Sequence, residues 1–302
     1  MMRLNEFMMK AMKAFNFISG SSAEEEDLKK HRESVEKMSR LVTPKDDVNI
    51  AHFKVGDIDC EAIRSCENFN PHYAIMYAHG GGYMSGGADY ARILGTKLAI
   101  ATGFTTVTFS YRLSPEHPYP AAIEDGMDVW NYLTRGVVSP THLYLAGDSA
   151  GGNLALCLTQ MLLSEGRETP KGLILFSPWT DMTGNAESYE TNKDVDPVLS
   201  KEFVENAVKV YINGAGTPDE ARFSPLFGSF DNFPPTVCFA GKNEILFDDS
   251  KRLCDRIKEA GGKAVFDVEE KGWHVYEQLP IPIANQAMRR LSKYIKDEQY
   301  GA

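Results

Sequence analysis

Short apolar runs alternate with helical patterns along most of the chain, and this alternation limits the possible folds more than any other feature. The apolar runs are rich in β-branched or aromatic residues, as buried strands are. They span residues 73–79, 105–111, 142–147, 172–178, 235–241 and 263–268. Helical patterns separate most of them, at 88–101, 120–135, 150–165 and 248–260. This order predicts an α/β fold with a mostly parallel central sheet and helices on both of its faces.

Elements near the two ends extend this plan. Alternating apolar and polar residues on either side of Gly56-Asp57 predict a β-hairpin before the first parallel strand. The last helical pattern spans about 281–297. The first 45 residues carry two helical patterns, and Pro44 ends the second of them.

One interval breaks the alternation. More than fifty residues separate "SPW" (177–179) from the next apolar run, and they contain a helical pattern at about 200–212. A structureless loop of that length is uncommon in a compact domain. We therefore expect the insertion and the N-terminal helices to form a helical cap. The expected parts are N-terminal cap helices (1–45), the first part of the core (46–179), a cap insertion (180–222) and the second part of the core (223–302).

Charge and cysteine content narrow the class of partners. The formal net charge is −10, which disfavours nucleic acid and anionic membrane surfaces because both attract basic patches. The five cysteines show no Cys-x-x-Cys pair and no zinc-like spacing, so we expect reduced thiols, no metal and a cytoplasmic location. Residues 1–20 are too polar for a signal peptide or a membrane span. We expect them to form a helix that packs on the protein, with a membrane-surface helix as the alternative.

The pentapeptide "GDSAG" (147–151) matches Gly-x-Ser-x-Gly. It follows an apolar run and opens a helical pattern, which is the strand–turn–helix setting of a nucleophile elbow. In that setting a strained backbone exposes the hydroxyl of Ser149, and Asp148 supports the motif. The alternative is a serine at an ordinary helix start. We expect Ser149 to be a nucleophile.

The stretch "HGGGYMSGG" (79–87) places consecutive glycines directly after a predicted strand. A dinucleotide-binding loop would need Gly or Ala where Ser85 stands, and the chain has no Gly-x4-Gly-Lys-Ser/Thr run. We interpret the loop as an oxyanion hole, in which the backbone N–H groups of Gly81 and Gly82 point to the oxygen of a tetrahedral intermediate. The N–H of Ala150, next to the predicted nucleophile, would be a third donor.

His79 and Gly80 open this loop and are expected to support it. His79 could instead be a metal ligand, but no partner ligand lies near it in the sequence.

The general base is expected to be His274, in "EKGWHVYEQ". It is the one histidine of seven that follows the last predicted strand. Catalytic groups of open α/β sheets gather at the carboxyl ends of the strands. A buried structural histidine is the alternative.

Several longer motifs occur together and in order. They are "HGGG", "GDSAGG", "YRLSPEHPYPAAIED" (111–125), "SPWTD" (177–181), "DP" (196–197) and "GWHVY" (272–276). Over nearly the whole chain they resemble the hormone-sensitive-lipase-like carboxylesterases (bacterial family IV) of the α/β-hydrolase superfamily. The resemblance implies a cap built from the N-terminal segment and the insertion, and ester hydrolysis without a metal or organic cofactor. It gives Arg112, Glu116 and His117 a structural role near the oxyanion glycines.

The acid that would hold His274 has three candidates in "AGKNEILFDD" (240–249). The family's pattern Gly-x-x-Asp-x-Leu-x-Asp aligns with "GKNEILFD", which puts Glu244 where relatives usually carry aspartate. The predicted elements agree: a helix that begins near Ser250 would make Asp248 its N-cap residue and place Asp249 in its first turn. Glu244 alone would lie in the loop after the strand, and glutamate is an accepted triad acid.

The expected activity is hydrolysis of short-chain acyl esters, from acetyl to about hexanoyl, through an acyl-enzyme. An amidase or peptidase with the same triad is an alternative, because pocket shape selects the leaving group. A non-catalytic small-molecule-binding relative and a true lipase are weaker alternatives. Tyr83, Met84 and Trp179 follow motifs at the active edge and are expected to line the substrate pocket, with core packing as the alternative. The expected partner is a small ester, and the sequence leaves a homodimer open.

Overall fold

The computed structural model describes residues 25–43 and 47–300. An eight-stranded sheet forms its centre, in the order β1-β2-β4-β3-β5-β6-β7-β8. The strands are β1 (Val48–Val55), β2 (Ile58–Ser65), β3 (Ala74–Ala78), β4 (Thr105–Phe109), β5 (Leu143–Asp148), β6 (Gly172–Phe176), β7 (Thr236–Gly241) and β8 (Ala264–Glu269). The pairs β1–β2 and β2–β4 are antiparallel, and all other neighbours are parallel. The predicted mostly parallel sheet is confirmed.

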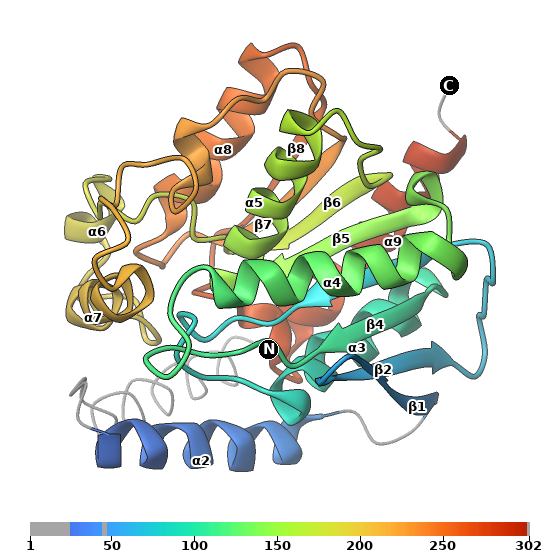
Figure 1. The fold of residues 1–302 in the computed structure, drawn as a ribbon, viewed down its shortest axis with the longest axis horizontal. Coiled ribbons are helices and arrows are strands. Elements are labelled where there is room, and N and C mark those ends of the chain that lie inside the picture. The colour runs from blue at the N-terminus through green and yellow to red at the C-terminus, as the bar shows by residue number, and fades with distance from the viewer. Residues whose placement is uncertain (1–24, 44–46, 301–302) are drawn as a thin grey trace.

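Helices cover both faces of this sheet (Figure 1). The helices are α2 (Glu25–Val42), α3 (Ala88–Thr102), α4 (Ala121–Gly136), α5 (Ala150–Ser164), α6 (Ser188–Thr191), α7 (Lys201–Ile212), α8 (Phe247–Glu259) and α9 (Pro282–Tyr300). Short 3₁₀ turns are η1 (Pro140–His142), η2 (Pro225–Phe227) and η3 (Tyr276–Gln278).

The central strands are buried on both sides because alternate side chains enter two separate cores. In β3, Met76 belongs to the core under α4, α5 and α8, whereas Ile75 and Tyr77 belong to the core under α3 and α9. Strands that are covered on both faces read as continuous apolar runs, which is why the sequence showed them so clearly.

The antiparallel edge of the sheet is the predicted hairpin. Val55 pairs with Ile58 across a turn at Gly56, whose φ of 58° lies in the left-handed region that glycine adopts without strain. The turn therefore fixes the register of β1 against β2.

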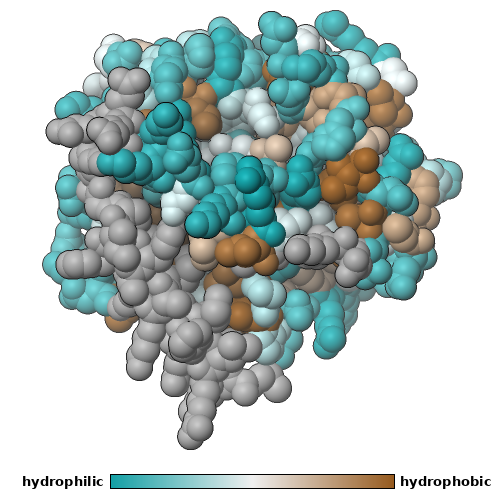
Figure 2. Space-filling view, turned by 90° about the horizontal axis from the view of Figure 1, so that it is seen from below, coloured by the Kyte–Doolittle hydropathy of each residue, from teal (hydrophilic) through white to brown (hydrophobic). Residues whose placement is uncertain are grey.

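Helix α2 lies along one side of the core, and α6 and α7 lie together at another edge of the molecule (Figure 1). Leu28 of α2 is buried in the main core. Seen from the side on which α2 lies, the described surface is mostly hydrophilic with separate apolar spots (Figure 2). The first of the two predicted N-terminal helices lies outside the described residues. Within the described part of the chain, no helix combines the length and the apolar character needed to cross a bilayer.

Candidate active site

Ser149 stands at a sharp turn between β5 and α5. Its φ of 51° and ψ of −120° lie outside the regions that non-glycine residues ordinarily adopt, at a cost of about 1–3 kcal/mol. Backbone hydrogen bonds hold this conformation: the Ser149 N–H donates to Phe176 O at 3.0 Å, and the Trp179 N–H donates to Ser149 O at 3.0 Å. Ser149 thus has the strained strand–turn–helix geometry that the motif predicts.

Small residues let the elements around this turn approach closely. A side-chain Cβ at Gly147 would overlap the carbonyl of Gly151, and a Cβ at Gly151 would overlap the carbonyl of Ala78 at the end of β3. The start of α5 is therefore pressed against the point where the glycine loop leaves β3.

The glycine loop carries unpaired backbone donors next to Ser149. Gly81 and Gly82 have φ values of 107° and 64°, and the Gly81 carbonyl accepts from the N–H groups of Met84 and Ser85. Among the residues that the structure describes, none accepts a hydrogen bond from the N–H of Gly81, Gly82 or Ala150. Unpaired N–H groups of this kind are what an oxyanion hole requires.

His274 and Glu244 form a buried pair. The Nδ1 of His274 lies 3.1 Å from Oε2 of Glu244, and the Glu244 side chain has no exposed surface. His274 follows β8 and Glu244 follows β7. These strands are parallel neighbours, so their carboxyl ends bring the two residues together. The structure thus places the two residues predicted as base and acid in contact.

Burial sets the protonation of this pair. It lowers the pKa of His274 to about 4, although the nearby carboxylates of Asp196 and Asp148 act in the opposite direction. It raises the pKa of Glu244 to about 8, and the Ser177 hydroxyl and a backbone N–H partly offset that effect. The imidazole is therefore neutral at neutral pH, as a general base must be.

No hydrogen bond joins the Ser149 hydroxyl to His274 in the described part of the structure. The histidine loop is nevertheless anchored beside the elbow. Ser177 Oγ accepts from the backbone N–H that follows His274 at 3.1 Å, and Gln278 Nε2 donates to Asp148 at 3.3 Å. Catalytic hydrogen bonds are often long without a substrate and shorten when one binds.

Asp148 connects the elbow to the glycine loop. Its buried carboxylate accepts from the phenols of Tyr77 at 2.5 Å and Tyr90 at 2.7 Å, and from the N–H of Gly80 at 2.8 Å. Burial raises the pKa of Asp148, and the two phenols lower it. The motif marked Asp148 as a support, but its tyrosine partners come from β3 and α3 and carry no local sequence signal.

His79 packs inside the glycine loop. Its ring is stacked on Tyr111 with 4.2 Å between the ring centroids, and Nδ1 lies 2.8 Å from the carbonyl of Gly80. Burial lowers the pKa of His79 to about 4, so the ring is neutral and Nδ1–H can donate to that carbonyl. These contacts favour the supporting role over the metal-ligand alternative.

The predicted pocket residues lie at the active edge but are deeply buried. The Tyr83 side chain has no exposed surface. Its ring stacks on that of Tyr211 of α7 with 3.8 Å between the ring centroids, and its hydroxyl donates to Asn153 Oδ1 at 2.8 Å. These contacts favour the packing alternative for Tyr83. Met84 and Trp179 are also buried, and their place in the pocket stays a prediction.

Two residues of α7 that the sequence did not single out lie against the glycine loop. A Cβ at Gly82 would meet Phe203 Cε1 at 3.2 Å and Ala207 Cβ at 3.3 Å. Both residues are on α7, where they look like ordinary apolar positions of an amphipathic helix. Only the folded chain shows that they cover an expected oxyanion donor.

The prediction for the start of α8 was wrong. The helix begins at Phe247, so Asp248 is a helical residue and not the N-cap. The Asp248 carboxylate accepts from the Ser188 N–H at 2.8 Å. Asp249 does lie in the first turn, but it is buried and accepts from the backbone N–H groups of Thr180 and Asp181. Tertiary contacts, more than the helix dipole, explain both carboxylates.

The loop that contains Arg112 and Glu116 braces two sides of the core. Glu116 pairs with Arg32 of α2, and Arg32 Nε donates to the carbonyl of Met84 at 2.7 Å, which ties α2 to the glycine loop. Arg112 instead pairs with Asp125 on α4.

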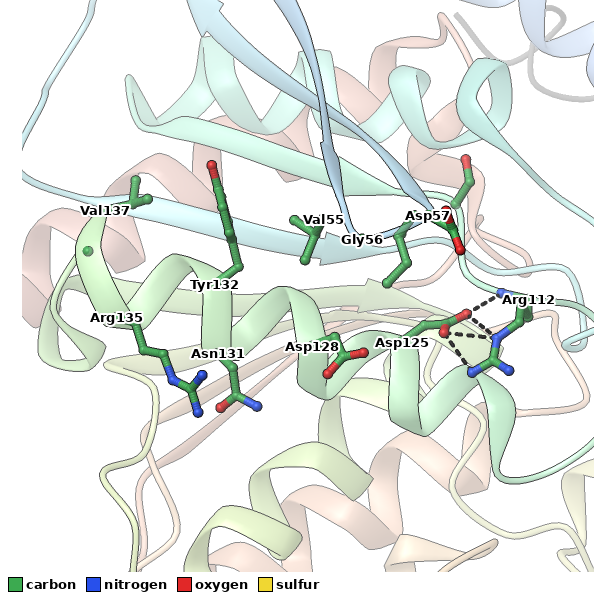
Figure 3. Close-up of a pocket in the computed structure, with 13 residues that line it drawn as sticks. Val55, Gly56, Asp57, Arg112, Asp125, Asp128, Asn131, Tyr132, Arg135 and Val137 are labelled. Atoms are coloured by element: carbon green, nitrogen blue, oxygen red, sulfur yellow. Dashed lines mark hydrogen bonds and ion pairs between the residues drawn. The ribbon is translucent and has the colours of Figure 1, made fainter.

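Arg112 and Asp125 line an open groove of about 1010 Å³ between the β1–β2 turn and α4 (Figure 3). None of the residues predicted to be catalytic lines this groove.

Comparison with known proteins agrees with the fold. The sequence model of the alpha/beta hydrolase fold matches residues 75–278. An esterase of Acinetobacter venetianus is 33% identical over 265 residues, which are 87% of each chain. An acetyl-hydrolase of Streptomyces hygroscopicus is 31% identical over 202 residues, which are 67% of each chain. A solved structure of an esterase from the bacterial hormone-sensitive lipase family superposes with a TM-score of 0.90 at 28% identity and covers 97% of each chain. The chain therefore belongs to the hormone-sensitive-lipase-like (family IV) carboxylesterases of the α/β-hydrolase superfamily and is a carboxylic ester hydrolase.

Proposed function

We propose that this enzyme hydrolyses short-chain acyl esters, from acetyl to about hexanoyl, through an acyl-enzyme on Ser149. His274 is the general base and Glu244 the acid that orients it. The observation that carries this proposal is the buried contact of 3.1 Å between His274 Nδ1 and Glu244 Oε2, next to the strained turn at Ser149.

In the first half-reaction, Ser149 Oγ attacks the ester carbonyl carbon and its proton passes to Nε2 of His274. The carbonyl π electrons move onto oxygen, and the resulting oxyanion is stabilised by the N–H groups of Gly81, Gly82 and Ala150. When the intermediate collapses, the bond to the alkoxy oxygen breaks. The proton held by His274 goes to the departing alcohol, and the acyl group stays on Ser149.

In the second half-reaction, water takes the place of the alcohol. His274 accepts a proton from the water as its oxygen attacks the acyl carbon, and the same backbone donors hold the oxyanion. Collapse expels Ser149 Oγ, which regains its proton from His274. Throughout, Glu244 fixes the tautomer of the imidazole and offsets the imidazolium charge in the transition state.

The low exposure of Ser149 supports a small acyl group. The Ser149 residue is only 7% exposed, and the cap residues Phe203 and Ala207 lie against Gly82. The similarity to an acetyl-hydrolase also supports an acyl group at the small end of the proposed range. The proposed substrate is therefore a small-molecule ester.

The cap that covers this site would consist of the N-terminal helices (1–45) and the insertion (180–222), on a catalytic core made of residues 46–179 and 223–302. Contacts of α2 and α7 with the glycine loop support this division. Arg32 donates to Met84 O, and Phe203 packs on Gly82.

The replacement Ser149→Ala tests the proposal directly. We expect turnover of p-nitrophenyl butyrate to fall by about 10⁴-fold or more, because the nucleophile is removed while the fold is kept. Thermal unfolding checks that the variant is folded. Substantial esterase activity in purified, folded Ser149→Ala protein would refute the assignment.

A further inference from the structure

Side chains of the cap insertion hold the loop that carries Glu244. Asn192, directly after α6, donates from Nδ2 to the carbonyl of Glu244 itself at 2.8 Å and to that of Lys242 at 3.1 Å. Asp196 accepts the N–H of Ile245 on Oδ2 at 2.9 Å. The peptide group that follows Glu244 is thus held at both its carbonyl and its N–H, and the carbonyl two residues before Glu244 is held as well.

Ser188, at the start of α6, holds the next turn of the same loop. Its hydroxyl donates to the carbonyl of Ile245 at 2.6 Å, and its N–H donates to the Asp248 carboxylate at 2.8 Å. The Asp248 N–H returns a bond to the Ser188 hydroxyl at 3.2 Å. Bonds from α6 and from the residues after it thus reach the acid loop at residues 242, 244, 245 and 248.

Asp196 is itself rigidly placed. Its Oδ1 accepts the N–H groups of Val198 and Leu199 at 2.8 and 3.0 Å, so both carboxylate oxygens are used and the side chain is buried. The turn that it forms leads directly into α7, the helix whose Phe203 lies against Gly82. The segment 196–203 thus connects the loop that carries Glu244 to the part of α7 that lies against the glycine loop.

We propose that Asn192 and Asp196 are positioning residues of the triad, which hold Glu244 against His274 from the cap. This inference rests on the proposed function, since it assumes that Glu244 is the triad acid. The glutamate side chain has three rotatable bonds, so its carboxylate reaches Nδ1 correctly only if its backbone is held in place. The cap segment then supports catalysis as well as covering the site.

A double-mutant cycle tests this role in the full-length enzyme. Asn192→Leu removes both amide donors at similar volume, and Glu244→Gln removes the triad carboxylate. With Glu244 present, we expect Asn192→Leu to lower kcat on p-nitrophenyl butyrate about tenfold and to change KM less than about twofold. In the Glu244→Gln background, the same replacement should lower kcat less than about twofold. Thr191→Val is the matched control, because the Thr191 hydroxyl donates to the carbonyl of Glu187, the residue before α6, and not to the acid loop.

A loss of kcat that is equal in both backgrounds would overturn the positioning role, and so would an effect on KM alone. If Asn192→Leu does not fold, judged by thermal unfolding, Asp196→Asn enters the same cycle with the same two expected outcomes. Glu244→Gln as a single variant separates this inference from the proposed function. Unchanged kcat in Glu244→Gln would refute the acid assignment, whereas a strong loss there without coupling to Asn192 or Asp196 would refute the positioning role alone.

Discussion

The Nδ1 atom of His274 and the Oε2 atom of Glu244 lie 3.1 Å apart, and both side chains are buried. The contact crosses from the loop after β8 to the loop after β7. It distinguishes Glu244 from the other two acids of the stretch 240–249 as the one in contact with the proposed base. The Asp248 carboxylate accepts from the N–H of Ser188. The Asp249 carboxylate accepts from the N–H groups of Thr180 and Asp181.

Replacing the acid should therefore have a specific effect. Glu244→Gln keeps the shape of the side chain and removes the charge that stabilises the imidazolium, so we expect kcat to fall by about 10²–10⁴-fold. Asp248→Asn should cost less than about tenfold, because Asp248 contacts Ser188 and not the histidine. Steady-state kinetics on p-nitrophenyl butyrate measures both. A larger loss in folded Asp248→Asn protein would mean that the acid was assigned to the wrong residue.

The buried pair predicts a particular pH dependence. Since burial raises the pKa of Glu244 to about 8, the carboxylate form increases as the pH rises through that value. The pKa of His274, lowered to about 4, leaves the imidazole neutral over the same range. We expect kcat/KM to rise from neutral into alkaline pH with a midpoint near 8, and this rise to disappear in Glu244→Gln. A midpoint near the ordinary histidine value of 6.5, unchanged in Glu244→Gln, would contradict this prediction.

Asp148 should matter for both stability and rate. Asp148→Asn removes the charge that the phenols of Tyr77 and Tyr90 and the N–H of Gly80 stabilise. Hydrogen bonds to a buried charged group contribute about 1.5–3 kcal/mol each. Asparagine keeps one of the two acceptor oxygens, so we expect the loss of one such bond and the weakening of the others, about 2–4 kcal/mol in the free energy of unfolding. The kcat should also fall, because the hydrogen bond from the Gly80 N–H to Asp148 fixes the loop that continues into the proposed oxyanion donors Gly81 and Gly82. Urea unfolding and kinetics measure the two effects, and Tyr90→Phe, which removes one bond, should show a smaller loss of both. Unchanged stability in Asp148→Asn would show that the network is dispensable.

Phe203 should limit acyl length. Its ring lies against Gly82, so Phe203→Ala opens space beside the oxyanion loop. The expected result is an increase of about tenfold in the ratio of kcat/KM for octanoyl over butyryl p-nitrophenyl esters, the size of effect that a change in pocket volume produces. Val208→Ala, on the same helix, is the control. If both variants keep the wild-type ratio, the acyl group does not bind beneath Phe203.

The features that the sequence predicted correctly depend on local patterns. Strands buried on both faces read as apolar runs. The candidate catalytic groups were proposed from their places after those runs, and their roles stay predictions. This is how Ser149 and His274 could be proposed before the fold was known. Glu244 needed the family pattern in addition, because three carboxylates stand close together in that stretch.

The features that the sequence missed depend on contacts between distant segments. Asn192 and Glu244 are 52 residues apart, and Tyr77 and Asp148 are 71 apart. Neither pair has a periodicity or a spacing that would reveal it. The helix start at Phe247 was missed for the same reason, because the Asp248 carboxylate accepts from Ser188 of α6 and is not the N-cap of its own helix.

Trapping the acyl-enzyme tests the central claim most directly. The enzyme is mixed with excess p-nitrophenyl butyrate, quenched in acid within the first turnovers and digested, and the acylated peptide is sequenced by mass spectrometry. We expect a butyryl group on Ser149 in the wild-type enzyme and none on that peptide in Ser149→Ala. A butyryl group on another residue that is required for turnover, or full turnover by Ser149→Ala, would contradict the account.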